Sequence, residues 1–465
     1  MQKLLAKYGL AAHLALLAAA PLLLFPFCAD SVIASVLLWL SIPAGLWTLL
    51  EPSMRGFEHL HDARKRVLRE IIRDPVFWVS LALVIYTGIR SVNTGIAVAY
   101  DAEVSSWHLT EAQFPFLPGV VGEGGVLPFA AAVSLVVLLQ GCRHSLGRSA
   151  RMAFLLLSSS LSGLGAVLAL LAIRHGHSGA LAFLSSVGRF ECSFVGFAFG
   201  LYLFAGVVSL VAIFQNRWYL SLALLILSVG GNGAGLLAFA PPYIVIAVLA
   251  AVLVMVAYAS AYSFILANVS TGSKILVLSC TALVIGGLIV AMFVSSSVLS
   301  ARLDAYVGFE LLPSRFWESR ELLSGVASET WKAHLWNGTG LGSFPLDFRF
   351  GATNEGWALF PRGVQLMPNG WWLALVERGI VGLVFFALPL VFLVVTYFCR
   401  LGGWVRELFL PHPACLMLPL ALALFVGVGF FDCSPLRAEA CVALATLLAV
   451  SAAAFPRMKR KENGR

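Results

Sequence analysis

Residues 371–398 of this chain read WWLALVERGIVGLVFFALPLVFLVVTYF. Apart from Glu377 and Arg378 near its start, the run carries no charge. About 20 consecutive apolar residues are enough to cross the hydrocarbon core of a bilayer as an α-helix. A segment surrounded by lipid must satisfy its backbone hydrogen bonds internally, and a helix does so within one segment. The run therefore predicts a membrane-spanning helix.

The composition of the whole chain points in the same direction. Of its 465 residues, 60% are apolar and 12% are charged, whereas a soluble protein carries about 45–50% and about 25%. So few charges do not cover the surface of a soluble protein of this length, and so much apolar surface excludes a disordered chain. The composition therefore excludes a soluble enzyme and indicates a polytopic membrane protein.

Twelve apolar runs of spanning length follow one another along the sequence. They lie at residues 8–28, 31–50, 75–91, 126–141, 152–173, 194–214, 219–240, 243–267, 275–297, 371–398, 412–432 and 438–455. Each run predicts a helix, so we expect an all-α, polytopic integral membrane protein with a single membrane domain over residues 1–465. Lys3 and Lys7 precede the first run as in a signal peptide, but a second run follows at once, and we expect an uncleaved first span.

The distribution of Lys and Arg predicts which ends of the helices face the cytoplasm. An even number of spans places both termini on the same side. With the termini inside, the inner segments hold 20 of the 31 Lys and Arg residues. These segments are mostly short loops, where the excess of cations on the cytoplasmic side is a strong topological signal. We therefore expect both termini to be cytoplasmic.

One inner segment, Arg55–Asp74, is rich in cations and contains regularly spaced apolar residues. Phe57, Leu60, Val67 and Ile71 recur among the charges. This pattern suits an amphipathic helix lying on an anionic inner leaflet. An ordinary basic cytoplasmic loop fits the same residues equally well.

The longest outer segment, residues 298–370, lies between the ninth and tenth runs and is too long for a passive connection. It holds six cations, seven carboxylates and eleven aromatic residues. Near-neutral charge with many aromatic rings suits a surface that binds sugars, and it also suits any folded cap at the membrane surface. We treat this segment as a periplasmic subdomain.

The sequence contains no nucleotide-binding fingerprint, zinc-site spacing or nucleophile elbow. The stretch Gly230–Gly233 predicts close helix packing or a tight turn. Charged residues inside spans mark transport pathways, and we expect the spans to be free of them beyond Glu377 and Arg378. That expectation disfavours an ion-coupled transporter and places any chemistry at the outer face.

Two elements within residues 314–385 carry a family resemblance. The first contains His334, Gly338, Gly340, Leu341, Gly342 and Phe344, with Arg320 lying 18 residues before Gly338; the second contains Asn369, Glu377, Gly379 and Gly382. Together with the spans and the outer segment, they resemble the O-antigen ligase and O-antigen polymerase superfamily of membrane glycosyltransferases.

The resemblance implies a function, a membrane and a set of partners. The chain would transfer or polymerise an undecaprenyl-diphosphate-linked glycan at the periplasmic face of the bacterial inner membrane, in the biosynthesis of lipopolysaccharide or a similar surface polysaccharide. The acceptor would be a glycan or lipid A. Membrane lipids are further partners, and neither a metal, a cofactor nor a nucleic acid is expected.

The chain departs from the family pattern at two important positions. Pro368 stands where the family has its catalytic His, and residues 231–234 (GNGA) replace a turn that contains Arg. Transfer from a diphosphate needs a base for the acceptor hydroxyl and cations for the leaving group. Arg320 remains as the expected diphosphate clamp.

Several other residues are candidates for the missing roles. His334 and Glu318 are candidate bases, although His334 also suits a structural turn and Glu318 an ion pair. Arg189 is a candidate second clamp or an interfacial arginine, and Glu377 suits pairing with an arginine at the outer face. Arg315, Trp317, Asn369 and Glu377 complete the expected substrate-binding residues.

Three classes of function stay open at this point. The first is an active ligase or polymerase. The second is a catalytically inactive relative that binds a lipid-linked glycan within an export assembly, which the missing His and Arg favour. The third is a flippase or transporter. The sequence does not specify the glycan or the acceptor.

Overall fold

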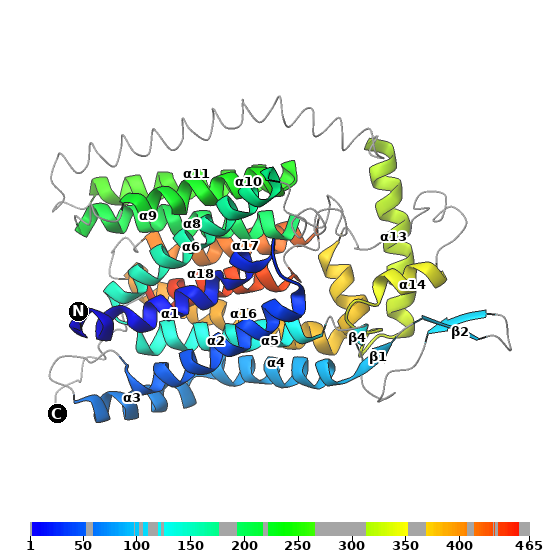
Figure 1. Ribbon diagram of the computed structural model, residues 1–465, viewed down its shortest axis with the longest axis horizontal. Helices are drawn as coiled ribbons and strands as arrows, with labels where there is room; N and C mark the ends of the chain where they lie inside the picture. Colours follow the sequence, from blue (N-terminus) through cyan, green and yellow to red (C-terminus); the bar gives the residue numbers. More distant parts are fainter. Residues whose placement is uncertain are drawn as a thin grey trace.

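The long helices of the chain lie side by side along the long axis of the molecule (Figure 1). The computed structural model describes residues 2–52, 59–96, 98–101, 106–109, 120–121, 125–175, 193–216, 222–265, 313–351, 369–406, 413–430, 432 and 436–454. The long helices are α1 (Gln2–Leu24), α2 (Asp30–Leu50), α4 (Pro75–Val92), α5 (Val126–Gln140), α6 (Arg148–Arg174), α8 (Ser193–Asn216), α11 (Pro242–Ile265), α16 (Gly370–Arg406), α17 (Met417–Gly429) and α18 (Ala438–Ala454).

Five helical segments within the described residues are long and apolar enough to cross a membrane. They are Asp30–Leu50, Pro75–Val92, Val126–Ser145, Arg148–Arg174 and Gly370–Cys399. Six further apolar helices are shorter, and they are Tyr8–Leu24, Val195–Ser209, Ala223–Phe239, Tyr243–Ala259, Met417–Gly429 and Ala438–Ser451. The chain is therefore a helical multi-span membrane protein. The predicted span at 275–297 lies outside the described residues.

The shorter elements lie mainly at the two ends of the bundle. They are the helices α3 (Leu60–Ile72), α9 (Leu222–Ile226), α10 (Asn232–Phe239), α13 (Pro313–Ala333) and α14 (Phe344–Gly351), the π-helices η1 (Gly141–Ser145) and η3 (Leu227–Gly231), and the 3-10 helix η4 (Pro413–Cys415). In Figure 1, α3 lies at one end, and α13 and α14 lie at the other. We call these the α3 end and the α13 end.

In the described part of the chain, four short strands add to the predicted all-α fold. Strand β1 (Thr94–Ile96) pairs in parallel with β4 (Val120–Val121). Strand β2 (Val98–Asp101) pairs with β3 (Ser106–Leu109) in an antiparallel ribbon. Both pairs follow helix α4 and lie at the α13 end (Figure 1). The spans themselves are helical, as the sequence predicts.

Helix α8 lies at the centre of the core and packs on α6, α10, α11 and α18. Phe197 and Phe199 are fully buried, and Tyr202 is 1% exposed. The Tyr202 hydroxyl donates a hydrogen bond of 2.6 Å to the carbonyl of Ala18 on α1. A buried phenol without a partner would cost about 1–3 kcal/mol, so this bond lets a large apolar ring be buried with its polar atom satisfied.

Helix α6 and the π-helix η3 approach each other so closely that only glycine fits between them. A Cβ atom at Gly163 would lie 1.9 Å from the carbonyl oxygen of Leu227, and one at Gly231 would lie 2.5 Å from the carbonyl oxygen of Gly163. The Ser162 hydroxyl also donates to the side chain of Asn232 at 2.7 Å. Small residues and cross-helix polar bonds are typical of contacts between helices in membranes. The predicted close packing of the Gly230–Gly233 stretch is confirmed at Gly231.

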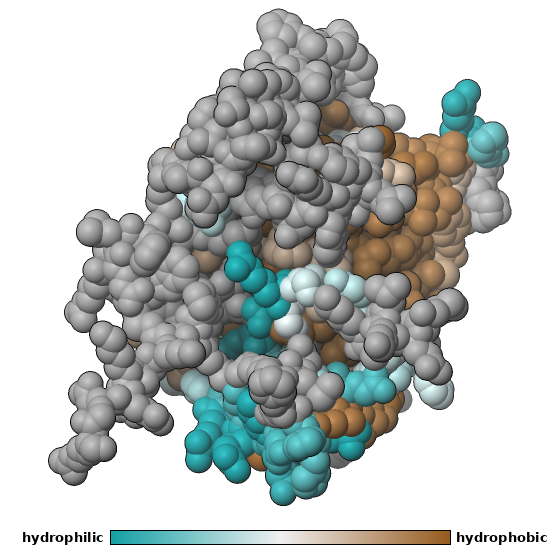
Figure 2. All heavy atoms as spheres, turned by 90° about the vertical axis from the view of Figure 1, so that its left-hand side faces the viewer, coloured by the Kyte–Doolittle hydropathy of each residue, from teal (hydrophilic) through white to brown (hydrophobic). Residues whose placement is uncertain are grey.

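The surface divides into an apolar wall and a polar edge. Figure 2 shows the molecule from the α3 end, with hydrophobic residues covering one side and hydrophilic residues gathered along the lower edge. Helix α2 also has large apolar side chains on its outside, since Trp39, Ile42 and Leu46 are exposed by 76%, 61% and 57%. Such large exposed apolar side chains are stable only against lipid or another apolar partner.

Candidate functional site

A glycine-containing turn between α13 and α14 docks on a kink in α16. Gly338, Gly340 and Gly342 have φ values of 68°, 124° and 76°, and Gly379 at the kink has φ 65°. Residues with a Cβ atom rarely adopt positive φ, whereas glycine does so readily. These four positions are glycines of the two sequence elements that carry the family resemblance, so the backbone conformation gives a physical reason for them.

Four backbone hydrogen bonds of 2.8–3.1 Å join the turn to the kink. They run from the amides of Thr339, Gly340, Ile380 and Val381 to the carbonyls of Val376, Glu377, Leu335 and Trp336, respectively. The contact leaves no room for side chains at its centre, because a Cβ atom at Gly379 would lie 2.3 Å from the carbonyl oxygen of Trp336. The two sequence elements therefore form one structural unit.

Arg90, near the C-terminal end of α4, connects α4 to the unit formed by the turn and the kink. Its side chain is 1% exposed. It donates hydrogen bonds to the Tyr86 hydroxyl at 2.6 Å, to the carbonyl of Asn337 in the turn at 3.1 Å and to the carbonyl of Glu377 before the kink at 2.8 Å. One guanidinium group thus connects α4, the turn and α16.

Arg90, like the buried Glu439 in the predicted span 438–455, corrects the expectation that charges inside the spans are confined to Glu377 and Arg378. The residue lies in the last turn of the apolar run 75–91 and is buried. Its partners Asn337 and Glu377 are 247 and 287 residues away in the sequence, so no local pattern identifies them. The only local signal is the position of a cation in the last turn of a helix, which the helix dipole favours.

A cavity of about 60 Å³ lies between α4, α5, α16 and α18, beneath the turn. Tyr86, Arg90 and Arg378 supply its polar lining. The Arg378 guanidinium lies 5.2 Å from the centre of the Phe386 ring. The other lining residues are apolar or small and are Leu83, Thr87, Pro128, Ala131, Ala132, Leu135, Leu341, Gly382, Phe386, Leu436, Ala438 and Cys441. Two arginine residues therefore line one largely apolar cavity.

Asp347 of α14 lies on the other side of the turn and is 8% exposed. Its carboxylate accepts hydrogen bonds from the hydroxyls of Thr339 at 2.8 Å and Ser343 at 3.0 Å. Burial raises the pKa of Asp347 above its usual value, although the two hydroxyls and nearby His334 oppose the rise. The candidate base His334 is exposed and lies directly after α13, in electrostatic contact with Asp347.

Arg320, the expected diphosphate clamp, reaches from α13 to the end of α17. Its guanidinium donates a hydrogen bond of 2.6 Å to the carbonyl of Phe430. Burial lowers the pKa of Arg320 below its usual value, and the nearby Tyr243 and Asp432 oppose this shift only in part. Tyr243 in turn donates a hydrogen bond to the carboxylate of Asp432. Arg320 therefore belongs to a second polar cluster, formed by α11, α13 and the residues after α17.

Asn369 caps the N-terminus of α16. Its side-chain oxygen accepts hydrogen bonds from the amides of Trp371 at 3.0 Å and Trp372 at 3.2 Å, as is typical of an N-cap residue. The Trp371 ring packs near Phe430, with ring centres 6.2 Å apart. Asn369 and Arg320 thus approach the same aromatic pair, and capping gives Asn369 a structural role.

The remaining candidates are described only in part. The backbone of Arg315, Trp317 and Glu318 lies in the first two turns of α13. Arg189 and Pro368 lie outside the described residues. Glu377 is half-buried, and its carboxyl group receives a hydrogen bond from the backbone of Gly342. Of the predicted site residues, the structure therefore brings Glu377 and His334 to the turn, bonds Arg320 to the carbonyl of Phe430 and places Asn369 at the start of α16.

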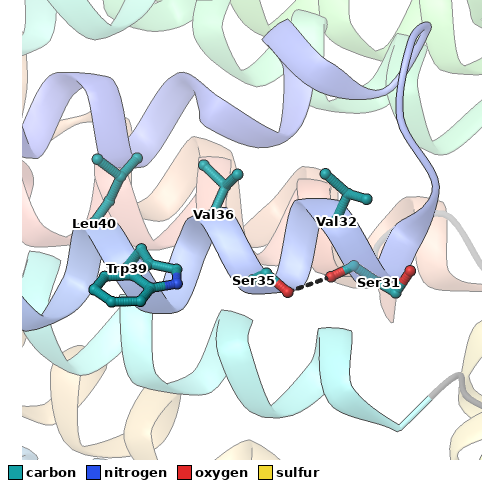
Figure 3. A pocket seen from close by; sticks show the side chains of 6 residues that line it. All are labelled: Ser31, Val32, Ser35, Val36, Trp39 and Leu40. Carbon is teal, nitrogen blue, oxygen red and sulfur yellow. Dashed lines mark hydrogen bonds between the residues drawn. The ribbon is translucent and has the colours of Figure 1, made fainter.

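A separate groove on α2 offers no comparable chemistry. It is lined by Ser31, Val32, Ser35, Val36, Trp39 and Leu40 (Figure 3). The Ser35 hydroxyl donates to the carbonyl of Ser31, as serines in helices commonly do. The groove has no charged residue and belongs to the apolar wall of the bundle. The candidate functional site is therefore the turn, the kink and the cavity beneath them.

Comparison with known proteins gives no family for the chain. No protein-family model matches the sequence, and no curated protein matches it either.

Proposed function

We propose that the chain binds a lipid-linked glycan through its diphosphate at the α13 end and transfers or polymerises that glycan, as an O-antigen ligase or polymerase does. The observation that carries this proposal is the pair of arginine residues, Arg90 and Arg378, that line one cavity between helices. Arginine binds phosphate oxygens through two parallel hydrogen bonds, and such bonds are strong where water is excluded.

The lining of the cavity suits an amphipathic ligand. Arg90 lies seven residues beyond Leu83 on α4, and Phe386 lies eight residues beyond Arg378 on α16. At 1.5 Å per residue, the backbone positions of Leu83 and Phe386 therefore lie roughly 10 Å deeper in the bundle than those of Arg90 and Arg378, and the Arg378 side chain reaches back toward the Phe386 ring. A prenyl diphosphate has the same division, with a doubly charged head and an apolar chain.

Binding requires the cavity to open. Its volume of about 60 Å³ corresponds to roughly two water molecules, which is less than a diphosphate occupies. Arg90 is fixed by three hydrogen bonds, whereas Arg378 is half-buried and stacks on Phe386. We therefore assign the movement to Arg378, which would leave the Phe386 ring and turn toward the phosphate.

A second candidate function is an inactive relative that binds the lipid-linked glycan without transferring it. The observation that favours it is the engagement of Arg320 with the Phe430 carbonyl, close to Asp432. An arginine held in this way is less available to a leaving diphosphate. Pro368 at the position of the family base points in the same direction.

Deletion of the gene in the native host tests the proposed function. Electrophoresis of the surface polysaccharide should show loss of the polymer attached to lipid A for a ligase, or a collapsed ladder of chain lengths for a polymerase. An unchanged pattern would contradict both activities and leave the binding relative as the better proposal.

Complementation with Arg378→Ala tests the cavity. Removal of one phosphate contact that strengthens in the transition state should slow transfer about 10- to 1000-fold, with normal insertion into the membrane. The matched control is Lys332→Ala, because Lys332 is an exposed cation at the same end and outside the cavity. Equal activity of the two variants would rule out Arg378 as a phosphate ligand.

Two substitutions at Arg320 separate the two candidate functions. Arg320→Ala should slow transfer about 10- to 1000-fold if the residue clamps the diphosphate. Arg320→Lys keeps a donor for the Phe430 carbonyl but loses the two-pronged phosphate contact. Full rescue by lysine would assign a structural role to Arg320, and partial rescue would support the clamp. Arg349→Ala, outside the matched elements, should stay close to wild type.

A further inference from the structure

Helix α3 carries a second apolar edge that does not pack against the bundle. Ala63, Val67 and Ile71 are buried, so this stripe holds the helix in place. Leu68 and Ile72 are exposed by 48% and 51%. They are four residues apart and share one side of the helix. The predicted amphipathic helix thus uses Val67 and Ile71 for packing and presents a different pair of apolar residues outward.

Exposed cations lie directly beside this apolar edge. The cations are spaced by four residues, at Lys65, Arg69 and Arg73, and therefore form a row along one side of the helix. None of the three forms an ion pair within the part of the chain that the structure describes. His61 and Asp62 are also exposed near the start of α3. The outward side of α3 is therefore basic and apolar at once.

The apolar edge continues into helix α4. The Trp78 indole donates a hydrogen bond of 2.8 Å to the carbonyl of Ile72, which joins the end of α3 to the start of α4. Trp78 is 53% exposed, and Ile85, Ile89 and Val92 are exposed further along α4. Their spacings of seven, four and three residues place all four on one face. Since α4 is a candidate membrane span, this face is its lipid-facing side.

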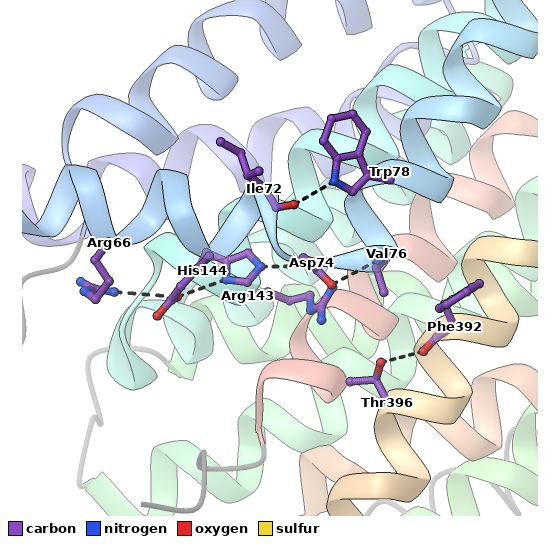
Figure 4. Close-up of polar contacts among 10 residues, drawn as sticks. Arg66, Ile72, Asp74, Val76, Trp78, Arg143, His144, Phe392 and Thr396 are labelled. Atoms are coloured by element: carbon purple, nitrogen blue, oxygen red, sulfur yellow. Dashed lines mark hydrogen bonds and ion pairs between the residues drawn. The ribbon is translucent and has the colours of Figure 1, made fainter. Parts of the chain in front are cut away.

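A buried ion-pair cluster fixes which side of α3 faces outward. Arg143 of η1 pairs with Asp74 before α4, and His144 bridges Asp74 at 3.2 Å and Glu70 of α3 at 3.3 Å. Burial favours a raised pKa of Asp74, but His144 and Arg143 hold it below its usual value. Figure 4 shows Trp78 pointing away from this cluster. The cluster and the apolar edge thus lie on different sides of the α3–α4 junction.

We propose that Lys65, Arg69 and Arg73, together with Leu68, Ile72 and Trp78, form a binding surface for the headgroups of anionic phospholipids. The cations meet the lipid phosphates, while the apolar side chains and the indole ring enter the adjacent acyl region. Basic clusters next to a membrane span attract anionic lipids, and Trp favours the membrane interface. Continuity with the lipid-facing side of α4 favours lipid over an acidic protein as the partner.

Thermal unfolding of the full-length protein in mixed micelles tests the proposal. The midpoint is measured as phosphatidylglycerol is added, with phosphatidylcholine as the neutral reference. The test variant is Lys65→Gln/Arg69→Gln. The matched control is Arg174→Gln/Lys332→Gln, which removes two exposed cations away from this surface. Each cation beside an anionic headgroup accounts for roughly a five-fold change in affinity. The test variant should therefore need about 25-fold more phosphatidylglycerol for half-maximal stabilisation.

The expected result is stabilisation of wild type and control by phosphatidylglycerol at similar concentrations, with the test variant shifted. Added salt should reduce the difference, because exposed charges are screened. Equal responses of all three proteins would overturn the proposal, since the lipid would then act elsewhere. Equal stabilisation of wild type by phosphatidylcholine, or none by either lipid, would also overturn it.

Discussion

A buried arginine lies at each end of helix α4, Arg143 of η1 at one end and Arg90 of α4 at the other, and the partners of the two residues differ. At the α3 end, Arg143 pairs with the carboxylate of Asp74, and their side chains are 5% and 6% exposed. At the α13 end, Arg90 donates its hydrogen bonds to a phenol and two backbone carbonyls. A carboxylate neutralises the charge of its partner, whereas carbonyl dipoles leave the charge of the guanidinium in place. The first arrangement holds helices together, and the second keeps a positive charge beside a cavity.

The largest expected effect follows from breaking the pair at the α3 end. Arg143→Met leaves the buried Asp74 without its main counter-charge, which should lower the free energy of unfolding by about 3–5 kcal/mol. Unfolding of the purified protein in detergent, titrated with a denaturing surfactant, measures the loss. The double variant Arg143→Met/Asp74→Asn removes both charges and should recover part of it. A double variant no more stable than the single one would show that the unpaired carboxylate is not the cause.

The next effect concerns the glycine kink at the α13 end. Gly379→Ala forces a residue with a Cβ atom into φ 65° and places that atom 2.3 Å from the Trp336 carbonyl oxygen. We expect a loss of about 2–4 kcal/mol in the same titration. Gly325→Ala is the matched control, because Gly325 lies within helix α13 and, among the described residues beyond its own stretch of helix backbone, no atom lies within 4 Å of its Cβ position. Similar losses in both variants would contradict a special role for the kink.

A smaller effect should follow from removing the arginine at the α13 end. Arg90→Met leaves only neutral partners unsatisfied, so it should lower the free energy of unfolding by about 1–3 kcal/mol. The turn loses its link to α4, so its amides should exchange hydrogen faster. Hydrogen-exchange mass spectrometry over residues 334–343 measures this change. A loss as large as that of Arg143→Met would show that Arg90 is held by charge, and the contrast between the two ends would fail.

The glycines at the α13 end are visible in the sequence, and the reason is physical. The positive φ angles at Gly338, Gly340, Gly342 and Gly379 are conditions that glycine alone meets easily, so they leave a mark in the sequence. Asn369 was expected among the substrate-binding residues, and the structure adds a capping role that a few residue types favour. Local backbone geometry is therefore readable from residue type and spacing.

Arg90 and the Asp74–Arg143 pair were not predicted, because their partners are distant in sequence. In the sequence, Arg143 is one of several cations in an inner loop, and Arg90 lies near the end of an apolar run. Both become interpretable only when packing brings Asp74, Asn337 and Glu377 beside them. The same holds for the cavity, whose lining comes from four helices and the turn. The apolar runs predicted the helices, but not which faces of the helices meet.

The smallest expected effect is a difference in pH dependence between two carboxyl groups, Asp74 at the α3 end and Asp347 at the α13 end. The pKa of Asp74 in the folded state is lowered from the usual value of 3.8. The charged Asp74 therefore stabilises the fold above pH 3.8, and this stabilisation is lost as the pH falls through the lowered pKa of the folded state. The pKa of Asp347 is raised. Between 3.8 and that raised pKa the folded state binds more protons than the unfolded state, so stability falls as pH rises through this range.

Two isosteric variants separate these contributions. Asp347→Asn keeps an acceptor for Thr339 and Ser343 without a buried charge, so its midpoint relative to wild type should improve as pH rises above 3.8 through the raised pKa of Asp347. Asp74→Asn should be destabilised relative to wild type throughout this range and should approach wild type only as pH falls below 3.8, through the lowered pKa of Asp74 in the folded state. Thermal midpoints in detergent measured against pH provide the comparison. Parallel curves for both variants would show that neither carboxyl group has a shifted pKa, and the electrostatic contrast between the two ends would then rest on geometry alone.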